Sequence, residues 1–267
     1  MPFFETKDGC TLFYETDGFE TSGPAVVLLN GTLQTTVYWK ALAPRLKNTF
    51  RVLMYDARGQ GQSDLGEQAL SLDIHVADLA ALLRHVEVER AHLVGVSHGA
   101  RVALASAAHF PVIVDRIVLC GVDAELTSRA RLIMGSWLEV LKRSGLETMV
   151  RVALPVVFGE AFLTSHERIL PTMVKAVVAR NSEEGLAAHL EAMTHYPSPA
   201  DMARGVQVPC LVLSGSDDTL VTDEGAGRLA SLCNGRHERI AGVGHSIPAE
   251  MPDLFGRTVL EFLCEPH

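Results

Sequence analysis

The sequence predicts an α/β protein built on a mostly parallel, doubly wound sheet, with an N-terminal antiparallel hairpin and an inserted helical lid. Three observations carry this prediction. Short, continuously apolar runs of β-forming residues alternate with amphipathic helical patterns, as in strand–helix–strand crossovers. The first segment of the chain alternates in the manner of a hairpin. A stretch of about 90 residues between two of the apolar runs has no strand pattern.

The strands follow from the apolar runs in chain order. The segments FFET and TLFYET, joined across Asp8-Gly9, predict the hairpin because that pair favours a tight turn. After a Gly/Ser/Pro stretch at 21–24, short apolar, β-rich runs predict strands, and continuous apolar runs of this kind are expected of strands buried on both faces. They lie at 25–29, 51–55, 91–96, 116–120, 210–215 and 237–241.

The helices follow from capping residues and helical spacing. Ser71 is a suitable N-cap, followed at helical spacing by Leu72, Val76, Leu79, Leu83 and Val86. Other helices are expected after Ser97, Thr222 and Pro252. Between the fourth and fifth of the later strands the sequence predicts three or four helices, too many for one crossover. We therefore predict a core formed by 1–123 and 206–267, and a helical lid inserted at 124–205.

Composition and charge exclude several classes of protein. The 267 residues are 48% hydrophobic and 21% charged, as in an ordinary globular chain that can bury a large core. A formal charge of −9 without a Lys/Arg cluster argues against a nucleic-acid or anionic-membrane partner. No apolar run approaches the roughly 20 residues of a membrane span.

The cysteines and the first residues bear on the compartment. Cys10, Cys120, Cys210, Cys233 and Cys264 are scattered and form no CxxC or Cys/His spacing, which favours a reducing compartment and no metal framework. The opening segment MPFFETKDGCTLFYE is too polar for a signal peptide. We expect a cytoplasmic protein.

The strongest chemical signal is Gly95-Val96-Ser97-His98-Gly99, which lies between a predicted strand and a predicted helix. This is the G-x-S-x-G pattern in the strand–turn–helix context of a nucleophile elbow. A serine on so tight a turn has a strained backbone, and its neighbours must be small for the chain to pass. The hydroxyl then stands above the sheet, near the N-terminus of the next helix. The sequence therefore predicts Ser97 as a nucleophile.

A serine nucleophile needs a base, which comes last in the chain in this architecture. His245 lies in a glycine-rich loop, 241–248, after the last predicted strand, and is the predicted base. The His98 side chain is expected to point away from Ser97, so only its backbone N–H is assigned a role. His195 in the lid is retained as a weaker candidate. The histidines interpreted as packing or surface residues are His75, His85, His92, His109 and His189.

The base needs a carboxylate that holds the imidazole in the correct tautomer. Asp217 and Asp218 follow the strand 210–215, and Asp123 follows the strand 116–120. All three lie at strand ends where an imidazole could meet them. Asp218 is favoured, and Asp217 and Asp123 remain as alternatives.

An oxyanion formed during acyl transfer needs two donors. The backbone N–H groups of His98 and Thr32 are predicted to supply them, the second from the turn Asn30-Gly31-Thr32 after an early strand. A second glycine cluster, 56–64, contains GxG, but Asp64 stands where a dinucleotide fingerprint needs its third glycine. We interpret that cluster as a structured turn. No zinc, EF-hand or phosphate-loop pattern is present in the sequence, so no cofactor and no metal are expected.

These motifs together resemble the α/β-hydrolases, and the resemblance covers essentially the whole chain. It is carried by Asn30-Gly31, DARGQGQSD at 56–64, GVSHG at 95–99, GSDD at 215–218 and GVGHS at 242–246. The family's usual spacing of the acid after the strand-end glycine selects Asp218 over Asp217. Asn30 stands where most members carry histidine. In this position the chain is similar to 3-oxoadipate enol-lactonases. The segments 30–36 and 214–230 also resemble bacterial 3-hydroxyacyl transferases of rhamnolipid and polyhydroxyalkanoate precursor synthesis.

The resemblance implies a serine hydrolase that cleaves a carboxylic ester, lactone or thioester through an acyl-enzyme on Ser97. Two alternatives remain: an acyltransferase that moves a (3-hydroxy)acyl group to an alcohol or thiol, and a slow signal-binding receptor on the same fold. The partner is expected to be a small acyl substrate with an apolar acyl group. Apolar lid residues more often pack against one another than line a pocket, but some must cover Ser97. The candidates are Met134, Trp137, Met149, Phe158, Phe162, Met173 and Met193.

Overall fold

The computed structural model describes residues 2–266, and its centre is one eight-stranded sheet with the order β1-β2-β4-β3-β5-β6-β7-β8. The first two pairings, β1 with β2 and β2 with β4, are antiparallel, and all pairings from β4 onward are parallel. The predicted fold class is therefore confirmed. The strands are β1 (Phe3–Glu5), β2 (Thr11–Asp17), β3 (Ala25–Leu29), β4 (Arg51–Tyr55), β5 (Ala91–Val96), β6 (Val114–Cys120), β7 (Cys210–Gly215) and β8 (Arg236–Ile240).

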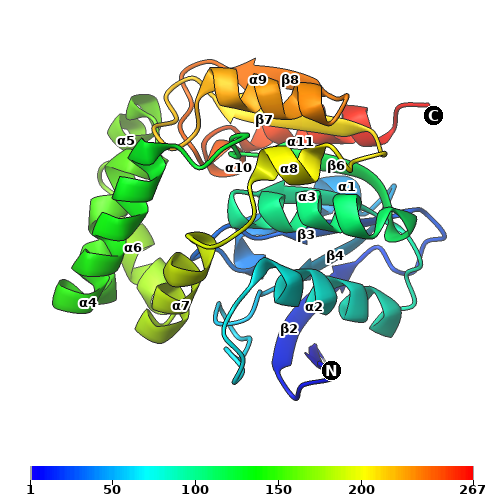
Figure 1. The fold of residues 1–267 in the computed structure, drawn as a ribbon, viewed down its shortest axis with the longest axis horizontal. Helices are drawn as coiled ribbons and strands as arrows, with labels where there is room; N and C mark the ends of the chain where they lie inside the picture. The colour runs from blue at the N-terminus through cyan, green and yellow to red at the C-terminus, as the bar shows by residue number, and fades with distance from the viewer. Residues whose placement is uncertain (1, 267) are drawn as a thin grey trace.

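Helices cover both faces of this sheet (Figure 1). One face packs against α2 (Leu72–His85), α3 (His98–His109), α8 (Pro199–Ala203) and α9 (Asp223–Leu232). The other packs against η1 (Thr36–Trp39), α1 (Ala43–Leu46) and α11 (Pro252–Leu263). Two short helices, η2 (Pro111–Ile113) and α10 (Ile247–Glu250), complete the core. The doubly wound arrangement explains why β3, β5 and β7 are buried along their whole length.

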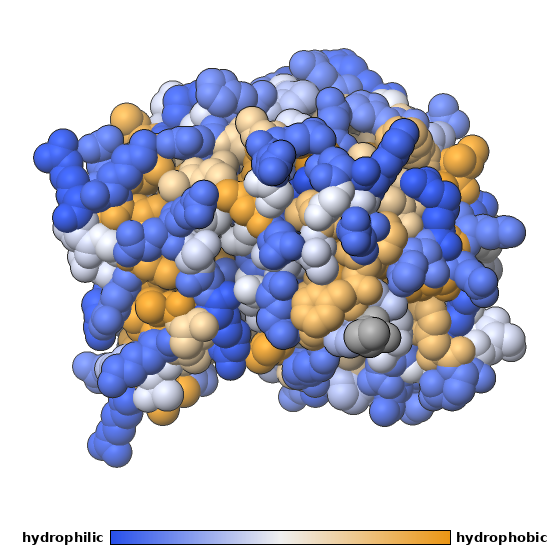
Figure 2. Space-filling model, turned by 90° about the horizontal axis from the view of Figure 1, so that it is seen from below, coloured by the Kyte–Doolittle hydropathy of each residue, from blue (hydrophilic) through white to orange (hydrophobic). Residues whose placement is uncertain are grey.

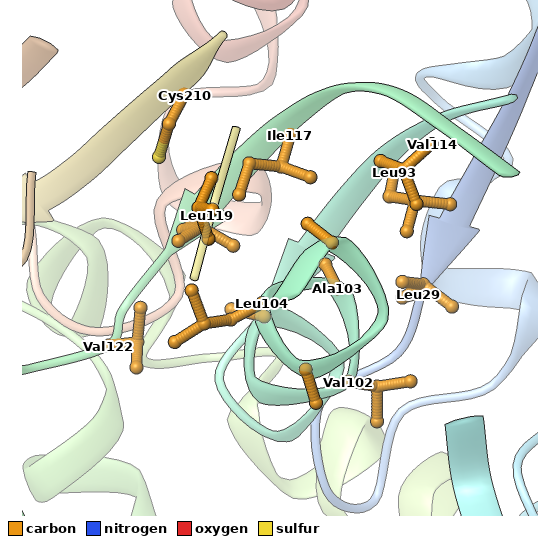
Figure 3. Packing of buried hydrophobic residues seen from close by; sticks show 14 of the residues in the cluster. Leu29, Leu93, Val102, Ala103, Leu104, Val114, Ile117, Leu119, Val122 and Cys210 are labelled. Atoms are coloured by element: carbon orange, nitrogen blue, oxygen red, sulfur yellow. The ribbon is translucent and has the colours of Figure 1, made fainter. Parts of the chain in front are cut away.

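The nucleophile helix α3 is packed directly on the central strands. Figure 3 shows Ala103 and Leu104 of α3 beside Leu93 of β5 and Ile117 and Leu119 of β6. All five side chains are fully buried. Small residues on the helix allow it to approach the sheet closely, which fixes the direction in which its first turn points.

The helices between β6 and β7 form a separate layer, at the left in Figure 1. They are α4 (Ser128–Val157), which bends at Gly145, α5 (Glu160–His166), α6 (Leu170–Val178) and α7 (Glu183–Met193). These four helices, which we call the α4–α7 segment, have an apolar cluster of their own that includes Leu141, Met149, Val174 and Leu190. The next helix, α8, falls within 124–205 but packs against α3 and α9.

Helix starts agree with the capping residues in the sequence. The Ser71 hydroxyl accepts a hydrogen bond from the Ile74 N–H at 3.2 Å, and Thr222 does the same for Gly225 at 3.0 Å. Two helices of four residues each, α1 and α10, were not predicted from the sequence. A helix of one turn has too few residues to show a hydrophobic period.

The surface of the molecule is mainly polar. Figure 2 shows hydrophilic residues over much of one face, with hydrophobic residues between them on the side that the α4–α7 segment occupies in Figure 1 and also across the middle of that face. Leu132, Val152 and Ile169 are among the exposed apolar side chains of that segment. Among the described residues, no helix is long and apolar enough to cross a membrane.

Candidate active site

Ser97 lies on a strained turn between β5 and α3. Its φ of 51° and ψ of −111° lie in a region that non-glycine residues rarely adopt, and its N–H donates to the Cys120 carbonyl at 2.8 Å. A Cβ on Gly95 would collide with the Gly99 carbonyl, and a Cβ on Gly99 would collide with the Leu29 carbonyl. The two glycines of the motif are therefore required by backbone contacts on both sides of the serine.

His245 is held in the loop after β8 by contacts on several sides. Its Nδ1 donates to Oδ2 of Asp218 at 2.8 Å, and its backbone N–H donates to the Val157 carbonyl at 2.8 Å. Gly121, at φ 66°, passes so close that a Cβ there would lie 3.0 Å from the imidazole Cε1. The buried Nε2 has no hydrogen-bond partner among the described residues, and His245 lines the same cavity as Ser97. This nitrogen is thus free to take a proton in that cavity.

The three candidate acids have different partners. The Asp218 side chain is completely buried, and its second oxygen accepts from the N–H groups of Leu220 and Val221 at 2.8 and 3.1 Å. Asp217 is exposed and accepts a hydrogen bond only from Ser216. Asp123 accepts from the N–H and hydroxyl of Thr222 at 3.0 and 2.7 Å, at the start of α9. Only Asp218 contacts the imidazole.

The pKa of His245 is raised above its ordinary value. Burial acts to lower the pKa, but the charge of Asp218 and its hydrogen bond to Nδ1 outweigh burial, and Glu250 adds a smaller effect in the same direction. Glu250 also accepts hydrogen bonds from the Gly244 and Gly159 N–H groups. It therefore joins the histidine loop to the end of α4.

The predicted oxyanion donors lie where β3 and β5 end. Thr32 and His98 both line the cavity that contains Ser97, and no hydrogen bond is formed by either backbone N–H to another described residue. Neighbouring groups are already engaged: the Gly31 N–H donates to Gln34 at 2.7 Å, and Asn30 is buried between Tyr55 and Trp39. Asn30 therefore positions the turn and is not itself available to an oxyanion.

The space above Ser97 that is free of protein atoms measures about 1060 Å³, including the part that is open to solvent. Of the apolar lid candidates, four line it: Met134, Trp137, Met149 and Met193. Phe158 and Met173 line a second cavity, while Phe162 stacks on Phe158 and on His166. More of these side chains face cavities than the expectation of packing implied, because the α4–α7 segment turns one apolar face toward the sheet. His195 is exposed and lines neither cavity.

Three histidines form a buried cluster that no pattern in the sequence predicted. His75 of α2, His98 of α3 and His189 of α7 are each at most 1% exposed, with ring centroids 4.5 to 5.3 Å apart. The His189 Nε2 donates to the Arg58 carbonyl at 2.7 Å, and the His98 Nε2 is 3.1 Å from the Tyr196 hydroxyl. The sequence indicated packing or surface positions for His75 and His189, and the structure places both in the interior. The cluster fastens α7 to the core.

A ring nitrogen from each of these three residues lies within 4.8 Å of the other two, the spacing of a possible metal site. The surrounding charges oppose a cation. Burial lowers the pKa of all three imidazoles, that of His189 to about 4, and the guanidinium groups of Arg58 and Arg101 contribute to the decrease at His75 and His98. Since the cluster has no carboxylate, we interpret it as neutral packing between helices.

The neutral cluster predicts acid sensitivity of the fold. Because His189 titrates at about 4 in the folded chain and near 6.5 when unfolded, the unfolded chain binds the proton first as the pH falls. The stabilisation is complete above about pH 6.5 and is lost toward pH 4, by roughly 3 kcal/mol for this residue. In His189→Gln the slope of unfolding free energy against pH should fall by about 1.4 kcal/mol per pH unit in that range.

Urea unfolding at a series of pH values measures this slope. The matched control is His109→Gln, since His109 is exposed at the end of α3 and its loss should leave the slope unchanged. Equal slopes in the wild type and His189→Gln would contradict the interpretation.

The sequence model of one protein family, the alpha/beta hydrolase fold, matches residues 24–252 of the chain. The chain belongs to the α/β-hydrolase fold family. An enol-lactonase from Burkholderia xenovorans is 26% identical to this α/β-hydrolase, with a TM-score of 0.91 and coverage of 99% of this chain and 100% of that one. A hydrolase from Pseudomonas aeruginosa is 30% identical, with a TM-score of 0.87 and 98% coverage of both chains. The 3-oxoadipate enol-lactonase 2 of Acinetobacter baylyi is 24% identical over 97% of each chain.

The glycine cluster at 56–64 of this α/β-hydrolase is a structured turn, as predicted. Asp56 is buried and accepts hydrogen bonds from the Thr36 and Gln62 N–H groups at 2.7 and 2.9 Å. A Cβ on Gly61, at φ 57°, would collide with the Asp56 carboxylate. Arg58 from the same turn forms a buried ion pair with Asp78 and a partly exposed one with Asp8. This network holds the turn against α2 and α7.

Proposed function

We propose that this protein is a serine hydrolase that cleaves a carboxylic ester, lactone or thioester through an acyl-enzyme on Ser97. The observation that carries the proposal is the arrangement around His245. Its Nδ1 is 2.8 Å from a buried Asp218 oxygen, and its partnerless Nε2 belongs to the cavity that Ser97 also lines. The likeness to enol-lactonases supports the same class of reaction.

The mechanism follows from these positions. The Ser97 hydroxyl attacks the substrate carbonyl while the Nε2 of His245 takes its proton, and Asp218 stabilises the imidazolium. The N–H groups of Thr32 and His98 bind the oxyanion. The tetrahedral intermediate then expels the alcohol or thiol, which receives the proton from His245. A water molecule, activated by the same imidazole, releases the acid and restores Ser97.

The cavity supports an apolar acyl group next to the serine. Met134, Trp137 and Met149 of α4, with Leu186 and Leu190 of α7, form its roof. We propose that the α4–α7 segment acts as the lid of this site. The predicted lid, 124–205, would then end before α8, which packs with the core.

A second candidate function is acyl transfer to an alcohol or thiol. The observation in its favour is a second cavity of about 930 Å³, which shares Thr32, Gln34 and Ser246 with the first. An acceptor bound there could take the acyl group before water does. Product analysis with and without added acceptor separates the two reactions, since only a transferase forms a new ester or thioester.

The experiment that tests the main proposal is turnover of a panel of esters, lactones and acyl thioesters by the full chain. A hydrolase should complete many turnovers per molecule and release the free acid. A signal-binding receptor on this fold should complete at most a few. Absence of turnover together with absence of covalent labelling by a fluorophosphonate would refute the proposal.

The rate should depend on the protonation of His245. Only the neutral imidazole accepts the Ser97 proton, and the pKa of His245 is raised, so kcat/KM should increase with pH through one ionisation above about 6.5. In Asp217→Asn the pH at the midpoint of this profile should equal that of the wild type, since Asp217 does not contact the imidazole. A flat profile from pH 5 to 9, with chemistry shown to limit the rate, would contradict this role.

A further inference from the structure

Arg101 is a buried cation without a counter-ion. It lies on α3, one helical turn after Ser97, and is 9% exposed. Its Nη2 donates to the Pro197 carbonyl at 2.8 Å, and the guanidinium lies 5.3 Å from the ring centre of Tyr196. The buried Nε has no hydrogen-bond partner, and no carboxylate of the described residues forms an ion pair with it.

Two other arginines are buried. Arg58 is 3% exposed and pairs with both Asp78 and Asp8, which raise its pKa. Arg116 is 3% exposed and donates to the Glu265 and Pro266 carbonyls. Burial lowers the pKa of Arg101 to about 10, and Tyr196 offsets only part of this decrease. An unpaired buried charge destabilises a fold, and one that lines a cavity is a candidate ligand site.

Arg101 belongs to the cavity that contains Ser97. Helical side chains lean toward the N-terminus of their helix, so Arg101 covers the turn that begins at Ser97. Two carboxylates line the same cavity, but both are engaged elsewhere: Asp123 with Thr222, and Glu125 with Ser198 at 2.9 Å. The cavity lining therefore holds one positive charge without an ion-pair partner, besides two carboxylates that accept hydrogen bonds from Thr222 and Ser198.

We propose that Arg101 binds a carboxylate of the substrate, so that the preferred substrates are esters, lactones or thioesters of acids that carry a second carboxylate. The proposal rests on the hydrolase function above. The planar guanidinium matches a carboxylate with two parallel hydrogen bonds. Arg101 is the only lysine or arginine among the described residues that line the cavity, and Asp123 and Glu125 also line it, so a singly charged carboxylate suits the cavity better than a phosphate dianion.

A short diacid serves as the probe, because its two carboxyl groups can be esterified separately. The test therefore compares monomethyl glutarate with dimethyl glutarate, which differ in the charge of the second carboxyl group. The variant is Arg101→Gln, and the control is Arg84→Gln, since Arg84 is exposed on α2.

In the wild type, kcat/KM for the monoester should exceed that for the diester by roughly 10- to 100-fold, the value of a hydrogen-bonded charge pair. Arg101→Gln should reduce this ratio to about one, whereas Arg84→Gln should leave it unchanged. Hydrolysis of the diester by Arg101→Gln at the wild-type rate shows that the variant is folded. An equal ratio in the wild type and Arg101→Gln would overturn the proposal.

Calorimetry with glutarate itself separates this inference from the hydrolase function. Glutarate should bind the wild type and Arg84→Gln, and its affinity for Arg101→Gln should be lower by roughly 10- to 100-fold. If the chain neither hydrolyses esters nor reacts with a fluorophosphonate but binds glutarate in this manner, only the hydrolase function fails. No glutarate binding by the wild type, or equal binding by Arg101→Gln, overturns the carboxylate site.

Discussion

Ser97→Ala is expected to abolish ester turnover and labelling by a fluorophosphonate, with the fold intact. The loss in kcat should be on the order of 10⁶, the size measured when the nucleophile of a serine protease is removed. Alanine retains the Cβ of serine, so the strained backbone at φ 51° is neither relieved nor made worse. The N–H groups of the turn stay in place, and any residual rate would come from oxyanion binding alone.

The measurements for this prediction are the rate of p-nitrophenyl ester hydrolysis, the fraction labelled, and the thermal midpoint. Ser106→Ala is the matched control, because Ser106 is a buried serine of the same helix whose hydroxyl donates only to the Val102 carbonyl at 2.8 Å. That variant should retain turnover and labelling. A Ser97→Ala protein that reacts with the probe at the wild-type rate would end the nucleophile hypothesis.

The fold could be predicted because its strands have a pattern that is hard to mistake. Strands covered by helices on both sides must be apolar throughout, and the runs at 25–29, 91–96 and 210–215 match β3, β5 and β7. The least apolar strand, β8, was displaced by one residue in the prediction. Its side chains are mostly exposed, so burial left little trace in its sequence.

The candidate site was predicted from short motifs at strand ends and from the order in which this architecture places nucleophile, acid and base. Gly95, Ser97 and Gly99 form one motif because the turn needs them at that spacing. The histidine cluster has no such motif: His75, His98 and His189 come from three helices, and only tertiary packing unites them. Arg101 was hidden for a similar reason, since its neighbours on α3 read as an ordinary amphipathic helix.

The residues alone left three aspartates open as the acid, because all three follow strand ends. Only the spacing that is usual in the resembling family favoured Asp218 over Asp217. The three aspartates are distinguished by which hydrogen bonds each carboxylate makes, which depends on how the loops after β6 and β7 pack. Asp123 is held at the start of α9, far from the role that its position at the end of β6 permitted.

Asp218→Asn should reduce kcat by about 10⁴, as the equivalent change does in a serine protease. The asparagine Oδ1 can still accept from the Leu220 and Val221 N–H groups, which leaves its amide nitrogen facing the Nδ1 of His245. The Nδ1 of His245 must then accept a hydrogen bond from this amide, so the imidazole carries its proton on Nε2. An imidazole with its proton on Nε2 cannot take the proton of Ser97. Substrate binding should change little, since Asp218 is completely buried behind the histidine.

The two other aspartates provide controls with different expected defects. Asp217→Asn should be nearly silent, because Asp217 is exposed and its one partner is the Ser216 hydroxyl. Asp123→Asn should lower stability by about 1 kcal/mol, the usual value of a hydrogen bond at a helix start, with kcat changed only a few-fold. The kcat and the thermal midpoint of all three variants distinguish loss of chemistry from loss of fold. A severe loss of kcat in Asp123→Asn beside a nearly normal Asp218→Asn would mean that the acid is misplaced, although the pair Ser97 and His245 could still act together.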